Sequence, residues 1–132
     1  MEHLAWKIRI SLLWLFTIIS DLANVLMSLS HPGVMEELMT GALSVGPVLM
    51  FVGAIVVLIP LVMAVLTLTL KDSLNRWLNI ILGIFISIVF LGNLIELATI
   101  MPAAHILLLS VAGFIAPVLI VWYAWKWPKQ EA

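Results

Sequence analysis

Four apolar runs, each long enough to cross a lipid bilayer, divide this sequence, and short polar stretches separate them. An α-helix rises about 1.5 Å per residue, so about 20 apolar residues cross a hydrocarbon core of roughly 30 Å. Hydrophobic residues make up 64% of the 132 residues and charged residues only 10%, which is more apolar surface than a soluble domain of this size can bury. We therefore expect an all-α polytopic membrane protein, with four transmembrane helices in one antiparallel bundle over residues 1–132. The expected spans are about residues 10–29, 47–70, 77–100 and 103–125.

Helix-breaking residues set the limits of the first two runs. The Ser-His-Pro-Gly segment at residues 30–33 ends the first run, and Glu36 and Glu37 are expected in an acidic loop after it. Pro47 suits the first turn of a helix, where a missing N–H group costs no hydrogen bond. Pro60 stands within the second run and predicts a kink there.

Two further boundaries lie in the second half of the chain. Residues 71–76 (Lys-Asp-Ser-Leu-Asn-Arg) are expected to form a tight hydrophilic turn, because so short a polar segment joins neighbouring helices. Pro102 separates the third and fourth runs, and Pro117 predicts a second kink.

The basic residues predict the orientation of the chain. All of them lie in the N-terminus, the turn at residues 71–76 or the C-terminus, and positive charge favours the cytoplasmic side. We therefore expect a multi-pass protein of the cell membrane with its N-terminus and C-terminus in the cytoplasm. The basic residues are Lys7, Arg9, Lys71, Arg76, Lys126 and Lys129. Aromatic residues typical of a membrane interface are expected at the same boundary, namely Trp6, Trp77, Trp122, Tyr123, Trp125 and Trp127.

Polar side chains inside the apolar runs are the candidate functional residues. A carboxylate there costs roughly 2.5–3.5 kcal/mol on insertion scales, so Asp21 and Glu96 require a partner, a proton or a function. Counted from the basic residues at the helical rise, both belong to the outer half of the membrane. Asn24 follows Asp21, and Asn93 precedes Glu96, at the i,i+3 spacing that places two side chains on one helix face. His105 begins the fourth run at the same level.

Three chemical interpretations of this outer cluster remain open. Asp21, Asn24, Asn93, Glu96 and His105 are expected to bind a ligand or ion, with burial favouring proton carriage by the two carboxylates. With His31, the carboxylates and histidines also suit zinc or manganese, although they lack the spacing of a metal motif. The third interpretation is that these groups form hydrogen bonds between helices and fix the packing of the bundle.

Other classes of function find no support in the sequence. It contains no nucleophile elbow, glycine-rich phosphate loop or spaced metal motif, so we expect no enzymatic activity, no catalytic residues and no cofactor. The absence of cysteine excludes disulfides and thiol chemistry. A net charge of −1 offers no field to attract nucleic acid.

The expected partners are the lipid bilayer and a second copy of the chain. Pairs of small residues four apart let membrane helices approach closely and support packing or a homo-oligomer. These pairs are Ala42/Gly46, Gly83/Ser87 and Ala112/Ala116.

Several short motifs resemble those of a family of small bacterial and archaeal four-helix membrane proteins of unknown function. They are Trp14-Leu15-Phe16 with Asp21, residues 33–38 (Gly-Val-Met-Glu-Glu-Leu), Ile59-Pro60 with Met63, Asn75-Arg76-Trp77 and Asn79-Ile80. The resemblance covers about the first two-thirds of the chain. It implies a four-span fold and carries no activity with it. An acidic residue often stands shortly before the Ile-Pro pair in that family, whereas this chain has Val57 and Leu58, so a site using that acid is not expected here.

Two functions from different classes follow. The first is a small transporter or channel for protons, cations or a small solute, with Asp21 and Glu96 as titratable groups and Asn24, Asn93 and His105 as supporting ligands. The alternative is a non-catalytic accessory or structural subunit whose polar residues fix packing or a partner interface.

Overall fold

The structure is a computed structural model that describes residues 2–41, 46–100 and 102–127, with only the backbone of residues 2 and 3. Ala42, one member of the expected small-residue pairs, lies outside this part of the chain. The all-α prediction is confirmed, and four of the helices are long and apolar enough to cross a membrane. The helices are α1 (Glu2–Ser28), α2 (Val34–Thr40), α3 (Pro47–Thr69), α4 (Asp72–Ile100) and α5 (Ala104–Trp125).

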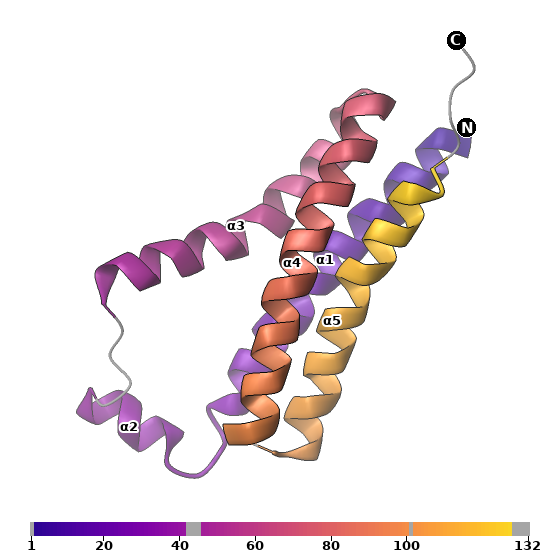
Figure 1. Cartoon of the computed structure of the whole chain (residues 1–132). Helices are drawn as coiled ribbons and strands as arrows, with labels where there is room; N and C mark the ends of the chain where they lie inside the picture. Colours follow the sequence, from indigo (N-terminus) through magenta and orange to yellow (C-terminus); the bar gives the residue numbers. More distant parts are fainter. Residues whose placement is uncertain (1, 42–45, 101, 128–132) are drawn as a thin grey trace.

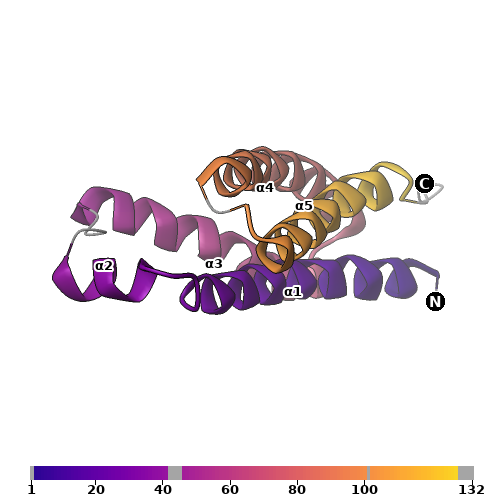
Figure 2. The same cartoon turned by 90° about the horizontal axis from the view of Figure 1, so that it is seen from below.

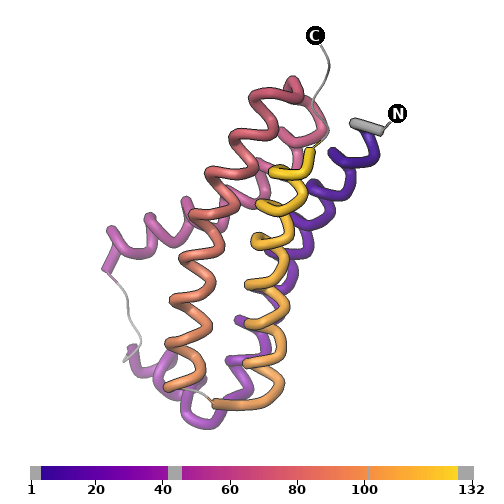
Figure 3. Tube along the Cα trace, turned by 45° about the vertical axis from the view of Figure 1, so that its right-hand side comes forward, coloured from indigo at the N-terminus to yellow at the C-terminus, as the bar shows by residue number. Residues whose placement is uncertain are grey.

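Helix α5 is the centre of the molecule. It packs along both α1 and α4, while α3 packs mainly on α1 and makes a smaller contact with α4. Figure 2 shows α5 between its two neighbours and α3 to one side. The N-terminal part of α1, the C-terminal part of α5 and the α3–α4 connection all lie at one end of the molecule (Figures 1 and 3). This places the described basic residues at a single end.

The connection between α3 and α4 is shorter than expected. Helix α4 already begins at Asp72, so the predicted polar turn at residues 71–76 is wrong for all but its first residue. The backbone N–H of Asn75 donates to Lys71 O at 2.9 Å, which continues the helical hydrogen bonding up to the turn. Asp72 in the first turn suits the positive end of the helix dipole. It also pairs with Lys7 of α1 at 3.2 Å, which joins two helices at this end.

The expected acidic loop contains a short helix, α2. Glu36 and Glu37 lie in its first turn, where carboxylates interact favourably with the helix dipole. Gly33 and Gly41 flank the helix with φ angles of 88° and 78°, a conformation that side chains disfavour. The loop prediction was therefore wrong for these two glutamates, because their charges stabilise a helix start.

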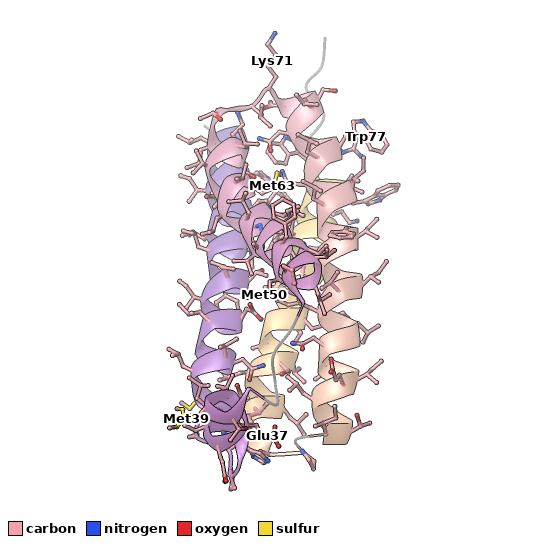
Figure 4. The ribbon with its side chains drawn as sticks, turned by 90° about the vertical axis from the view of Figure 1, so that its left-hand side faces the viewer. Glu37, Met39, Met50, Met63, Lys71 and Trp77 are labelled. Carbon is pink, nitrogen blue, oxygen red and sulfur yellow. The ribbon has the colours of Figure 1, made fainter. Side chains whose placement is uncertain are left out.

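Helix α3 consists of two halves that run in different directions. Figure 1 shows the helix bending near its middle, the part that holds Pro60, so that its first half leaves the other helices. Proline removes one helical hydrogen bond and crowds the preceding turn, which accounts for a bend. Seen from that side, Met50 lies about halfway along the bundle, far from the end marked by Met39 (Figure 4). The antiparallel bundle therefore includes α3 only through its second half.

The polar anchors of α3 explain this division. Residues 47–66 contain no polar side chain, and residues 47–55 are exposed throughout. Contacts with α1 and α4 are concentrated further on, where Ser11 Oγ donates to Ala64 O at 2.6 Å and Thr67 is fully buried. Interhelical hydrogen bonds favour helix association in an apolar medium, so α3 is held where it offers them.

Large apolar side chains remain exposed along all four long helices. A soluble monomer rarely leaves so much contiguous apolar surface in water. Together with the length and hydropathy of the helices, this surface fits a membrane protein.

Candidate functional site

Asn24 is the most deeply buried of the polar residues selected from the sequence. Its side chain is 5% exposed and its Nδ2 donates to Ser110 Oγ of α5 at 2.8 Å. The other amide atom, Oδ1, is buried and accepts no hydrogen bond from any described residue. A buried acceptor without a donor costs roughly 1–3 kcal/mol, so Asn24 Oδ1 marks a position suited to a hydrogen-bond donor or a cation.

The surroundings of Asn24 form a tight seam between α1 and α5. Ser20, one turn earlier in α1, is buried. A Cβ atom built on Gly113 of α5 would lie 3.6 Å from Ser20 Cβ and 3.6 Å from the ring of Phe90. The glycine therefore lets the two helices approach closely, and α4 contributes Phe90 to the same contact. The pair Asn24–Ser110 is thus a polar link within apolar packing.

Asp21 lies one turn before Asn24 on α1 and is half-buried. Its i,i+3 relation to Asn24 places both side chains on one face of the helix. No hydrogen bond or ion pair connects its carboxylate to another described residue. Asp21 therefore lies one helical turn from an amide oxygen that accepts no hydrogen bond from a described residue, and both groups can accept hydrogen bonds from a ligand.

The other three predicted residues come from α4 and α5. Asn93 is half-buried, whereas Glu96 and His105 are exposed. Glu96 precedes the end of α4 at Ile100 by four residues, a distance of about 6 Å. Its carboxylate therefore lies near the end of the helix, where it reaches polar surroundings more easily than from the middle of a span.

The five predicted residues do not form one hydrogen-bonded cluster. Among the described side chains, the structure joins Asn24 to Ser110 and none of the five to one another. Groups of three or more His, Asp or Glu side chains that could hold a metal ion are absent from the described part of the chain. The geometry thus supports a site centred on α1, at Asp21 and Asn24.

A second polar cluster, which the sequence interpretation missed, joins α1, α3 and α4. Trp14 Nε1 donates to Asn79 Oδ1 at 2.6 Å, and Thr67 Oγ1 donates to the same oxygen at 3.3 Å. Asn79 Nδ2 donates to Asn75 O at 2.8 Å and to Asn75 Oδ1 at 2.7 Å. Asn75 Nδ2 completes the network by donating to Thr67 O at 2.6 Å. All four side chains are completely buried.

This second cluster uses the hydrogen-bonding capacity of its amides internally. The amide of Asn79 donates twice and accepts twice, so it has little left to offer a ligand. A satisfied buried network stabilises and specifies packing. The i,i+4 spacing of Asn75 and Asn79 could have indicated that the two side chains share one helix face. Because the third span was expected to begin at Trp77, Asn75 was assigned to a turn instead.

Comparisons with known proteins agree with the motif-based prediction of a family without an assigned function. No curated protein and no solved structure gave a significant match to the chain. One family model matches residues 2–132, which extends the expected resemblance from the first two-thirds to nearly the whole sequence. The chain therefore belongs to this family, a family of unknown function (DUF6326).

Proposed function

We propose that the chain is an integral protein of the cell membrane, with its four long helices crossing the bilayer and both termini in the cytoplasm. The hydropathy and length of the helices support the crossing. Support for the orientation comes from the described basic residues, which lie at the end that holds the N-terminal part of α1, the C-terminal part of α5 and the α3–α4 connection (Figure 1).

Within this membrane protein, Asp21 and Asn24 form the binding part of a small transporter or channel. The observation that carries the proposal is Asn24 Oδ1, which is buried and accepts no hydrogen bond from a described residue, one helical turn from the half-buried Asp21. A proton, a cation or a small solute with N–H or O–H groups complements both oxygen-bearing groups. Asn93, Glu96 and His105 serve as supporting groups toward the outer end of the helices. No catalytic step or cofactor is part of this proposal.

Ion and proton flux into liposomes containing the purified protein tests this function. Replacing Asp21 with Asn removes the charge and keeps the size of the side chain, so flux should fall at least tenfold while the melting temperature is unchanged. Glu96→Gln should have a smaller effect because Glu96 is exposed near the end of α4. Glu37→Gln changes an exposed carboxylate of α2 and serves as the control for surface charge. Equal flux in the wild type and Asp21→Asn would contradict the proposed role of Asp21.

The second candidate function is a non-catalytic accessory subunit. The first half of α3 favours it, because residues 47–55 are exposed and leave the rest of the molecule (Figure 1). The flux experiment separates the two functions. If neither the wild type nor Asp21→Asn conducts ions or protons, and Asp21→Asn has the lower melting temperature, Asp21 contributes to packing and the accessory function is favoured.

A further inference from the structure

A groove of about 440 Å³ runs between α4 and α5 on the outside of the bundle. Ile84 and Ile88 of α4 line it together with Val118 of α5. Ser87, the polar residue of this lining, donates its hydroxyl to Gly83 O at 2.7 Å. Away from its tryptophans, the lining is otherwise aliphatic, and this stretch of the groove suits a hydrocarbon chain.

Aromatic and basic residues gather at one end of this groove. Trp122 and Trp125, which line it, are 52% and 62% exposed. The guanidinium of Arg76 lies 5.9 Å from the ring centroid of Trp125 and 5.8 Å from that of Trp77. Such distances allow cation–π contact and hold the guanidinium beside the groove.

Arg76 also has hydrogen-bonding capacity left over. Its Nε donates to Ala124 O at 3.1 Å and its Nη2 to Trp125 O at 3.4 Å, which caps the last turn of α5. Arginine carries five N–H donors, and bonds to described residues account for two of them. Lys126 follows Trp125 directly and is exposed. The end of the groove therefore combines positive charge with free donors.

We propose that this groove binds an anionic phospholipid, with an acyl chain along α4 and α5 and the headgroup phosphate at Arg76 and Lys126. The inference rests on the proposed insertion in a membrane. Phosphate oxygens match the planar donor fork of arginine, and basic sites between membrane helices recognise anionic headgroups. Exposed tryptophans are typical of the level of the headgroups. Ile88 follows Arg76 by twelve residues, about 18 Å along α4, so the groove extends from that level into the apolar core.

Native mass spectrometry of the full-length protein in detergent tests the site with phosphatidylglycerol and phosphatidylcholine at equal concentrations. Phosphatidylglycerol should bind at least fivefold better, because one basic residue near a headgroup accounts for about a fivefold preference. Arg76→Gln should lower that preference about fivefold, and so should Lys126→Gln. Arg9→Gln is the matched control, since its guanidinium also lies over a tryptophan, 6.0 Å from the ring of Trp6, but on α1.

A second pair of variants tests the groove without disturbing the cap on α5. Ile88→Trp fills the groove from an exposed position on its wall and should reduce retention of both lipids at least fivefold. Ile95→Trp adds the same side chain at an exposed position of α4 outside the lining, and it should bind lipid as the wild type does.

Several outcomes would overturn the proposal. Equal binding of the two lipids would exclude recognition of the anionic headgroup. An equal loss of the preference for phosphatidylglycerol in Arg76→Gln and Arg9→Gln would show that the general surface charge, and not this site, causes the preference. Unchanged retention by Ile88→Trp would exclude the groove as the site of the acyl chain. Competition by inorganic phosphate at the same concentration would identify a phosphate site in place of a lipid site. Recovery of the wild type in carbonate-washed membranes tests membrane insertion separately.

Discussion

At the scale of single residues, two asparagine side chains connect helices by hydrogen bonds. Asn79 connects α4 to Trp14 of α1 and Thr67 of α3 through one carboxamide oxygen. Asn24 connects α1 to Ser110 of α5, and its own oxygen accepts no hydrogen bond from the part of the chain that the structure describes. The two asparagines therefore differ. Both the oxygen and the nitrogen of the Asn79 amide form hydrogen bonds, whereas Oδ1 of Asn24 accepts none from a described residue.

Replacing Asn79 with Leu should destabilise the protein. The change leaves the buried indole N–H of Trp14 and Oδ1 of Asn75 without partners, which should lower the free energy of unfolding by about 1–3 kcal/mol. Asn93→Leu is the matched control on the same helix, because Asn93 is half-buried and forms no hydrogen bond with a described residue. Unfolding by SDS in mixed micelles, followed by circular dichroism, measures both. Equal stability of the two variants would contradict a structural role for the network.

At the scale of elements, α3 differs from the other long helices because its two halves have different surroundings. Its second half is anchored by Thr67 and by the bond from Ser11 to Ala64. At the end of the same helix, Lys7 Nζ donates to Leu70 O at 3.2 Å. The first half has only apolar side chains, so nothing directs it toward α1 or α4. The bend at Pro60 therefore sets where the first half lies.

Pro60→Ala should straighten α3 and bring its first half closer to α4. Alanine restores the backbone N–H and removes the clash of the ring with the preceding turn. Because the wild-type chain has no cysteine, spin labels at Met50→Cys and Ile95→Cys report this distance without interference. We expect a shorter distance in Pro60→Ala by double electron–electron resonance in lipid nanodiscs. As a control, labels at Leu68→Cys and Ile81→Cys, in the anchored part of the helices, should keep their separation. An unchanged distance between positions 50 and 95 in Pro60→Ala would show that Pro60 does not set the bend.

At the scale of the whole molecule, the two ends of the bundle have opposite chemistry. One end carries Lys7, Arg76 and their ion-pair and capping contacts. The other carries Glu36 and Glu37 on α2, near Met39 in Figure 4. A protein that crosses a membrane with this distribution of charge should keep its basic end in the cytoplasm.

Single cysteines should report this orientation in intact cells. Met39→Cys should react with a membrane-impermeant maleimide added outside, since Met39 is exposed at the acidic end. Ser73→Cys should react only after the membrane is permeabilised, and this change keeps every basic residue in place. Labelling of Ser73→Cys in intact cells would reverse the proposed orientation.

The sequence by itself determined the helical class, the number of long apolar helices and most of their limits. Hydropathy and helix-breaking residues are local properties, so span lengths and the positions of Pro47 and Pro60 could be predicted from the chain alone. The membership of an uncharacterised family was predicted in the same way, from short motifs. The polar residues of the spans could likewise be identified by their cost in an apolar run.

Only the tertiary structure decided which of those polar residues meet. Asn24 forms a hydrogen bond with Ser110, 86 residues away in the sequence, and Trp14 forms one with Asn79, 65 residues away. The periodicity of a single helix cannot predict contacts at such separations. The start of α4 at Asp72 depends on Lys7 of α1, which pairs with that carboxylate. The burial of Asn75 depends on Thr67 of α3, whose backbone oxygen accepts its hydrogen bond. The arrangement of the helices decides these contacts, because hydropathy identifies apolar helices and does not specify which of them are neighbours.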